Sequence, residues 1–304
     1  MVKRFKKKDG KQKVYEAYER LLGLWGVDIQ EIDIDTTFGK THIITSGNRE
    51  NLPLLMFHGV GDNSAIMWIY NVQELVKHFY VIIVDTIGGP GKSEPNENYS
   101  KNFDQSLWID DILNTLNIDK IDIAGVSNGA YIAQHYAITR PNRVNKIVCM
   151  AGSISTKNSP NPLFGLMKVV MPEALFPTKK NVTKLLIKLS GPNYDVFTKN
   201  EAIMDQWACL LKYFNNMSMA YHKLKKFSAE EIATIREKSL FLVGDSDRLV
   251  FSPNTIKELE DNKLNYKIIK NAGHGINHEQ SEVINNEIVN FFIYDSEDAI
   301  NVAK

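Results

Sequence analysis

The sequence predicts an α/β fold in which a mostly parallel, twisted sheet carries helices on both faces and is interrupted by an all-helical insertion. Short, almost wholly apolar runs recur along the chain, and segments with helical spacing separate them. The strand-like runs stop after residue 152 and return only at residue 239, and helical patterns fill the gap. Alternation of buried strands and helices favours a parallel sheet, and the gap indicates the insertion.

Each element has its own signal. The sheet starts with an antiparallel pair, residues 27–36 and 40–47, in which apolar and polar residues alternate around Phe38-Gly39. Later strands are predicted at 52–59, 80–85, 121–126, 144–152, 239–245 and 265–273. Helices are predicted at 14–26, 64–78, 103–118, 128–140, 161–176, 201–221, 252–262 and 276–293.

These elements divide the chain into four predicted parts. The parts are a basic N-terminal helix at 1–27, a core domain at 28–152, a helical insertion at 153–237, and the rest of the core at 238–304. A chain of 304 residues is long enough to bury a large core in one such domain. We expect the basic N-terminus to be a solvated, frayed start to the first helix.

Composition excludes several classes of protein. The 36 basic and 36 acidic residues cancel, so we expect no attraction to nucleic acid. No apolar run approaches a membrane span and the N-terminus lacks the apolar core of a signal peptide, so we expect no stable membrane association. Cys149 and Cys209, both in apolar surroundings, favour free thiols and a cytoplasmic location. The oligomeric state has no signal in the sequence.

A serine between two glycines carries the first chemical signal. Residues 121–126 predict a buried strand, a helical pattern follows, and Gly125-x-Ser127-x-Gly129 stands between them. A serine on such a sharp strand-to-helix turn holds its hydroxyl clear of the sheet, and side chains at the two glycine positions would collide with neighbouring elements. The turn also opens a helix, so the Asn128 N–H is placed to bind an oxyanion.

A serine hydroxyl needs a base, and the base needs an orienting acid. His274 is the candidate base, because it stands between two glycines directly after the last predicted strand. Asp245 and Asp247 follow the preceding strand, and Asp247 is the preferred acid because it lies further from the sheet. Asp245, nearer the strand end, is expected to hold the turn through backbone amides. All these positions lie at carboxyl ends of strands, where open α/β sheets bind ligands.

A second oxyanion donor is expected in the loop that follows residues 52–59. The backbone N–H of Val60 is best placed for this role, just past His58. His58 itself is expected to brace the loop.

Two rival sites fail on their details. The segment Gly88-Gly-Pro-Gly-Lys-Ser93 looks like a phosphate loop, but Thr86 stands where that loop needs glycine and Pro90 removes one cradling amide. His278 stands four residues after His274, but Gly275 occupies the place of the glutamate in a H-E-x-x-H zinc motif. No G-x-G-x-x-G follows a predicted strand, so a dinucleotide site is also excluded.

Four motifs in this order, each at a strand end, resemble the α/β-hydrolase superfamily, and within it the capped serine esterases and lipases of bacterial type. The resemblance covers roughly residues 28–295. The motifs are His58-Gly59-Val60-Gly61, Gly125-x-Ser127-x-Gly129, Gly244-x-x-Asp247 and Gly273-His274.

The resemblance implies a role for each site residue. The matching positions are the nucleophile Ser127, the acid Asp247, the base His274, and the oxyanion amides of Val60 and Asn128. The helical insertion matches the cap of that family. Residues 85–93 stand where the family carries an Arg-Gly-x-Gly-x-Ser-type loop, but this chain has no arginine there and one extra glycine.

We therefore expect a serine hydrolase of carboxylic esters with small to medium apolar acyl or alcohol groups, acting through an acyl-enzyme without metal or organic cofactor. Ser127 argues against dehalogenases and epoxide hydrolases, which use aspartate. The serine-based alternatives are monoglyceride lipase or lysophospholipase, carbon–carbon bond hydrolase, thioesterase and cofactor-free haloperoxidase. An alternative of another class is a hydrolase-fold binding or sensor protein with little turnover.

Overall fold

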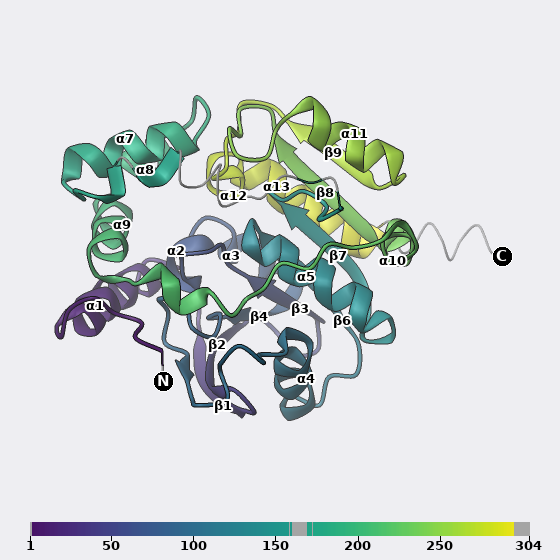
Figure 1. Cartoon of the computed structure of the whole chain (residues 1–304), viewed down its shortest axis with the longest axis horizontal. Helices are drawn as coiled ribbons and strands as arrows, with labels where there is room; N and C mark the ends of the chain where they lie inside the picture. The colour runs from purple at the N-terminus through teal and green to yellow at the C-terminus, as the bar shows by residue number, and fades with distance from the viewer. Residues whose placement is uncertain (1, 158, 160–168, 172, 295–304) are drawn as a thin grey trace.

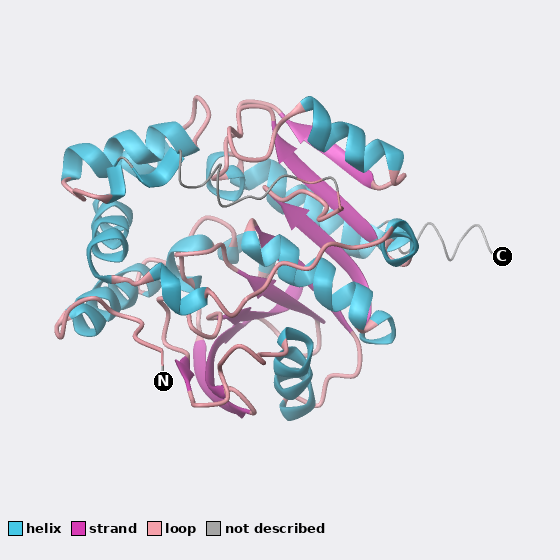
Figure 2. Ribbon diagram, viewed as in Figure 1, coloured by secondary structure: helices cyan, strands magenta, loops and turns pink. Residues whose placement is uncertain are grey.

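A single mixed sheet organises the part of the chain that the computed structural model describes, residues 2–157, 159, 169–171 and 173–294 (Figures 1 and 2). The strand order is β1-β2-β4-β3-β6-β7-β8-β9, and a short β5 pairs with β2. β1, β2 and β4 pair antiparallel, and all pairs from β4 to β9 are parallel. The strands are β1 (Gln30–Thr36), β2 (Gly39–Ser46), β3 (Leu52–Phe57), β4 (Phe79–Val84), β5 (Glu94–Pro95), β6 (Ile121–Val126), β7 (Val144–Met150), β8 (Ser239–Gly244) and β9 (Asn265–Ile269).

Helices cover both faces of this sheet (Figure 2). On one face lie α1 (Gly10–Leu22), α2 (Ser64–Met67), α3 (Val72–Leu75), α12 (Ile276–Glu279) and α13 (Ser281–Val289), followed by a π-helix, η4 (Asn290–Tyr294). On the other face lie α4 (Gln105–Thr115), α5 (Asn128–Thr139), α10 (Ala229–Ala233) and α11 (Pro253–Asp261). The 3-10 turns η1 (Pro141–Arg143) and η3 (Arg236–Lys238) precede β7 and β8.

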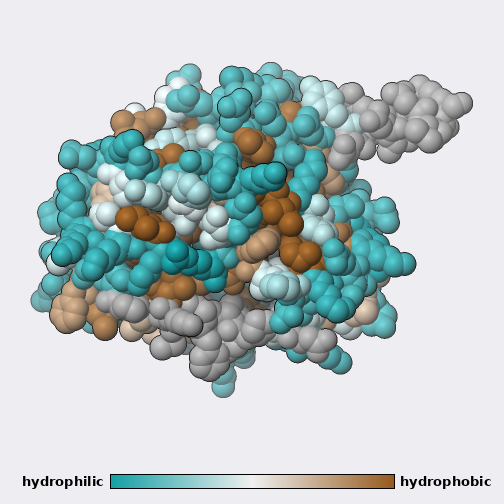
Figure 3. Space-filling view, turned by 90° about the horizontal axis from the view of Figure 1, so that it is seen from above, coloured by the Kyte–Doolittle hydropathy of each residue, from teal (hydrophilic) through white to brown (hydrophobic). Residues whose placement is uncertain are grey.

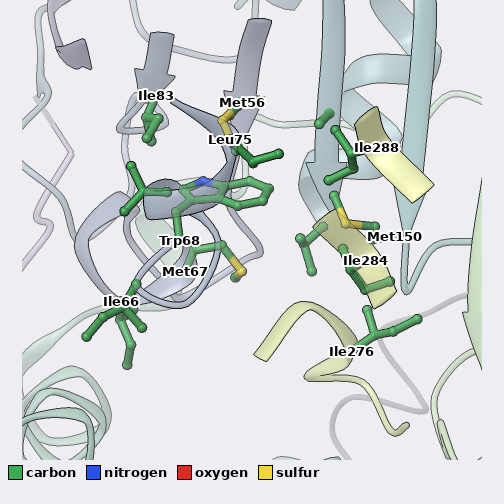
Figure 4. Close-up of a cluster of buried hydrophobic side chains, with 14 of the residues drawn as sticks. Met56, Ile66, Met67, Trp68, Leu75, Ile83, Met150, Ile276, Ile284 and Ile288 are labelled. Atoms are coloured by element: carbon green, nitrogen blue, oxygen red, sulfur yellow. The ribbon is translucent and has the colours of Figure 1, made fainter. Parts of the chain in front are cut away.

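Two separate cores show why the strands are apolar on both sides. Successive side chains of a strand point to opposite faces, so Met56 joins the core under α2 and α13, while Phe57 joins the core under α4 and α5. Figure 4 shows the first core, where Trp68, Met150 and Ile288 converge from a turn, a strand and a helix. Continuous apolar runs are therefore required, as the sequence predicts.

The order of the strands reverses beside β3. The chain runs from β3 outward to β4, then returns to place β6 on the other side of β3. A crevice at the carboxyl ends of the strands is expected at such a reversal. The loops after β3 and β6 meet there, and they contain Val60 and Ser127.

Residues 64–78 and 276–293, each predicted as one continuous helix, are broken, and the predicted helix 201–221 ends at Tyr213. Residues 64–78 form α2 and α3 with a turn between them, and the Asn71 side chain in that turn donates to the Asn277 carbonyl and to Asn285. Residues 276–293 are interrupted at Gln280 (φ −130°, ψ 43°), whose amide donates to the carbonyls of Lys270 and Asn271. Contacts with residues outside each predicted helix overrule the helical spacing in 64–78 and 276–293.

The segment between β7 and β8 contains helices and turns in its described part. These are α7 (Lys179–Leu189), α8 (Asp195–Thr198), α9 (Glu201–Tyr213) and η2 (Asn216–Met219), with α10 close to β8. The helix predicted at 161–176 lies mostly outside the described residues. The division at 153 and 237 stays a prediction.

The expected frayed N-terminus is wrong for residues 2–6. Arg4 is buried, Phe5 bridges to Phe214, and the backbone N–H of Lys6 donates to the Tyr213 carbonyl at 2.7 Å. α1 then packs along α9. The N-terminus therefore ties the core to the segment between β7 and β8.

Among the described residues, no helix combines the length and the apolar character that crossing a membrane requires.

The turn between β6 and α5 yields a stability prediction. A Cβ on Gly129 would lie 2.2 Å from the Phe57 carbonyl oxygen, which belongs to the backbone of β3. Gly129→Ala should therefore lower the free energy of unfolding by about 1–3 kcal/mol, measured by urea denaturation. Gly23→Ala is the matched control, because its nearest heavy atoms are 3.6 Å away and its φ is −61°. Equal stability of the two variants would contradict the packing described here.

Candidate active site

Ser127 lies at the tip of the β6–α5 turn in a backbone conformation that side chains rarely adopt. Its φ is 55° and its ψ is −111°, and its backbone N–H donates to the Met150 carbonyl at 2.8 Å. A Cβ on Gly125 would lie 2.2 Å from the backbone of Gly129, so the strand and the helix cross with no room for a side chain. The two glycines therefore allow the turn that the sequence predicts.

Three loops bring Ser127, His274 and Asp247 together. His274 Nε2 lies 2.9 Å from Ser127 Oγ, and His274 Nδ1 lies 2.9 Å from Asp247 Oδ2. The three side chains follow β6, β9 and β8, which lie in the same half of the sheet. A hydroxyl, an imidazole and a carboxylate in this chain of contacts can move a proton away from the hydroxyl.

The surroundings of Asp247 determine which nitrogen of His274 carries the proton. Asp247 is almost fully buried, and its Oδ1 accepts from the backbone N–H of Leu249 at 2.8 Å and of Val250 at 3.2 Å. These amides leave Oδ2 to accept the N–H of His274 Nδ1. The Nε2 lone pair then faces the hydroxyl of Ser127. The amide contacts expected for Asp245 are thus made by Asp247, while Asp245 accepts from the Ser246 hydroxyl.

Two opposing effects set the pKa of His274. Burial lowers the pKa of the imidazole, but the charge and hydrogen bond of Asp247 raise it, and Glu279 adds to that increase. The pKa is raised overall, so the acidic neighbours outweigh desolvation. His274 is consequently a stronger base than a histidine in water.

The loop after β3 lies directly beside Ser127. A Cβ on Gly59 would come within 3.6 Å of the Cβ of Ser127, which places the next residue, Val60, at the edge of the site. Asn128 is the first residue of α5, so its N–H has no acceptor within the helix. Both backbone amides predicted for an oxyanion therefore belong to the two loops that meet at Ser127.

His58 holds the loop after β3 against the loop after β4. Its Nε2 accepts from the backbone N–H of Thr86 at 2.9 Å, and its Nδ1 donates to the Gly59 carbonyl at 2.8 Å. Burial lowers the pKa of His58, in keeping with a neutral ring that donates from one nitrogen and accepts at the other. These contacts are those of a bracing residue.

His278, the second histidine of the zinc motif considered above, contacts the protein backbone. No cluster of three or more potential metal ligands occurs among the described residues, and His278 is buried with its Nε2 against the Ile66 carbonyl at 2.8 Å.

Two surface cavities of about 710 and 1110 Å³ lie beside α1, β1 and β2, and none of their lining residues belongs to the contacts of Ser127.

Comparison with known proteins agrees with this geometry. A family model described as alpha/beta hydrolase fold matches residues 53–176. Carboxylesterase YbfK of Bacillus subtilis is 25% identical over 284 residues, which cover 91% of this chain and 92% of that protein. The uncharacterized carboxylesterase nap of the same organism is 24% identical over 297 residues, 91% of each chain. The crystal structure of naproxen esterase from Bacillus subtilis matches with a TM-score of 0.81 at 24% identity, over 94% of this chain and 99% of that one.

The chain has the α/β-hydrolase fold and is similar to carboxylesterases along most of its length. These matches confirm the resemblance and the fold class that the four sequence motifs predict. The motif loops lie at the carboxyl ends of β3, β6, β8 and β9.

A contact that the sequence does not predict braces the glycine-rich loop at residues 85–93. Arg4 Nε donates to the Gly89 carbonyl at 3.0 Å, and the same guanidinium contacts the Gly91 carbonyl and lies 3.3 Å from a Glu94 oxygen. An arginine from the N-terminus therefore contacts a loop that has no arginine of its own. Only the basic character of the N-terminus was visible in the sequence, because these partners are more than 80 residues away.

Asp85, at the start of the same loop, was likewise missed. It is fully buried, and its carboxylate accepts from the backbone N–H groups of Ser64 and Lys92 and from the Tyr18 hydroxyl, at 3.0, 2.7 and 3.0 Å. Burial raises the pKa of Asp85, but neighbouring histidines and these backbone donors lower it overall. The ionised carboxylate therefore fixes the path of the loop.

The contacts of the two aspartates predict different effects on His274. Asp247→Asn removes the charge that supports the imidazolium, so the pKa of His274 should fall by about one unit or more, measured by NMR titration of the imidazole protons. Asp245→Asn is the matched control, since its carboxylate contacts the Ser246 hydroxyl instead. A larger fall in the Asp245 variant would mean that the wrong carboxylate is assigned to His274.

Proposed function

We propose that the chain is a serine hydrolase of carboxylic esters. The observation that carries this proposal is the contact between Ser127 Oγ and His274 Nε2 at 2.9 Å, together with the contact between His274 Nδ1 and Asp247 at the same distance. The names of the carboxylesterases and esterase to which the chain is similar support the same reaction.

In this mechanism Ser127 Oγ forms a bond to the acyl carbon and its proton passes to His274 Nε2. The Asp247 carboxylate stabilises the charged imidazole. The oxyanion is received by the backbone amides of Val60 and Asn128, each of which contributes about 3 kcal/mol in the transition state. The carbon–oxygen bond to the alcohol then breaks, and the alcohol leaves with the proton from His274.

Water completes the reaction. It attacks the acyl-enzyme while His274 accepts one of its protons, and the bond between the acyl carbon and Ser127 Oγ breaks. The proton returns to Ser127, and the carboxylic acid is released. Every step uses side chains and backbone groups of this chain and one water molecule.

We infer that residues 153–237 act as a cap that selects apolar esters of small to medium size. Apolar side chains are exposed in the described part of this segment, and Figure 3 shows hydrophobic residues gathered in patches on the face seen from above. The exposed ones are Met171, Leu175, Phe176, Ile187, Met217 and Leu224. Val60 is apolar yet 38% exposed, which makes its side chain available to a substrate at the site.

The free thiols of Cys149 and Cys209 support a cytoplasmic location.

Removal of the hydroxyl tests the proposed nucleophile. Ser127→Ala should lower kcat on a p-nitrophenyl ester by several orders of magnitude and leave the fold intact, because the acyl-enzyme can no longer form. Ser100→Ala, in the loop before α4, is the matched control. Ser127→Ala activity within tenfold of the wild type would remove Ser127 from the mechanism.

A panel of esters of graded acyl length tests the substrate range. The wild-type chain should show the highest kcat/KM for small to medium apolar acyl groups.

The raised pKa of His274 predicts the pH dependence of the reaction. His274 acts as a base only when neutral, so kcat/KM should rise with pH and reach half its plateau above pH 6.5, the ordinary value for histidine. The measurement is kcat/KM for one ester across the pH range in which the fold is stable. Half-maximal activity below pH 6.5 would contradict the electrostatic account of the site.

A further inference from the structure

Glu279, the last residue of α12, contacts two segments that lie far apart in the sequence. Its side chain is buried, and Oε1 accepts from the backbone N–H of Gly273 at 2.9 Å. Oε2 accepts from the backbone N–H of Gly191 at 2.7 Å. Gly273 immediately precedes His274, and Gly191 follows the end of α7. One carboxylate therefore joins the histidine loop to the segment between β7 and β8.

The same two segments touch backbone to backbone. The His274 N–H donates to the Leu189 carbonyl at 2.6 Å. A Cβ on Gly273 would lie 2.4 Å from the carbonyl carbon of Ser190, and one on Gly191 would lie 3.1 Å from Gly273 N. No side chain fits at Gly273 and one at Gly191 would be tight, so a shift of residues 189–191 has to move the histidine loop or break these hydrogen bonds.

The charge of Glu279 also acts on His274. It raises the pKa of the imidazole, in addition to the larger effect of Asp247. The pKa of Glu279 is raised to about 7, because burial and the charge of Asp247, which raise it, outweigh the two amide donors and His274, which lower it. The two N–H groups require acceptors at both oxygens, so the ionised carboxylate is the form that makes both bonds.

We propose that Glu279 is a positioning residue that holds His274 in place and couples its orientation to the position of the segment between β7 and β8. This inference rests on the proposed function, because it takes His274 as the base. Glu279 supports the imidazolium from the side of α12, while Asp247 supports it from the loop after β8. The orientation of the base thus depends on a contact made by the proposed cap.

Glu279→Gln tests the proposal, because it keeps the shape of the side chain but replaces an acceptor oxygen with a donor and removes the charge. The pKa of His274, measured by NMR titration, should fall by about 0.5–1 unit. The acid limb of the kcat/KM profile should move to lower pH by the same amount. At the plateau, kcat should fall by about tenfold or more, with a smaller change in KM. Glu282→Gln, an exposed position in α13, is the matched control and should change neither quantity.

A role in stability alone would give a different result. It would lower the melting temperature of Glu279→Gln and leave the titration of His274 as in the wild type, and that result would overturn the proposal. The titration reads the imidazole directly, so it decides the role of Glu279 even if the wild-type chain hydrolyses no ester. An absence of turnover in the wild type would count against the proposed function alone.

A second measurement needs no variant and decides the matter if Glu279→Gln fails to fold. In the wild type, the amide protons of Gly191 and Gly273 should exchange slowly with solvent, because both are bound to a buried carboxylate. Lowering the pH through 7 should weaken the protection of both amides together, as Glu279 takes up a proton. Fast exchange of either amide at pH 8 would overturn the proposal.

Discussion

The close crossing of α5 over β6 and β3 is the constraint on which the site depends. Gly125 and Gly129 let the backbones approach to distances that a Cβ would block, and this approach places Ser127 at a φ of 55°. Such a conformation persists only where its surroundings fix it, and here the helix, the two strands and the bond to the Met150 carbonyl do so. The cost of the strained turn is offset by the burial around it, and the half-buried Ser127 lies at the edge of the sheet.

The rest of the site follows from the order of the strands. Parallel strands end at the same edge, so loops that are distant in the sequence meet there. β8 and β9 are neighbours, and their loops place Asp247 next to His274. The buried Asp247 accepts two backbone N–H groups of its own loop, which fix the position of its carboxylate. The base is thus oriented by a carboxylate that is itself held in place.

The sequence predicts those parts of the structure that depend on local pattern. The apolar runs identify the strands because both faces of the sheet are buried, and each motif lies at a strand end because turns have local requirements. The sequence therefore also predicted which side chains meet, and the structure places Ser127, His274 and Asp247 within hydrogen-bond distance. Their catalytic roles stay a prediction.

Features that depend on distant partners were not predictable in this way. Arg4 looked solvated because its carbonyl partners follow 85 and 87 residues later. Glu279 is an ordinary helical residue by pattern, and only the fold brings Gly191 to its second oxygen. The predicted helix 276–293 is interrupted where Gln280 reaches back to the loop before His274. In each case a polar side chain satisfies backbone groups that no local pattern reveals.

The central claim is that the Ser127 hydroxyl is activated by His274, and a fluorophosphonate probe tests it most directly. Such a probe reacts with an activated serine and not with an ordinary hydroxyl. The account predicts one adduct per folded chain by intact mass, located on the peptide that contains Ser127 and absent from the unfolded chain. Folded protein that gives no adduct, or an adduct on another residue, would contradict it.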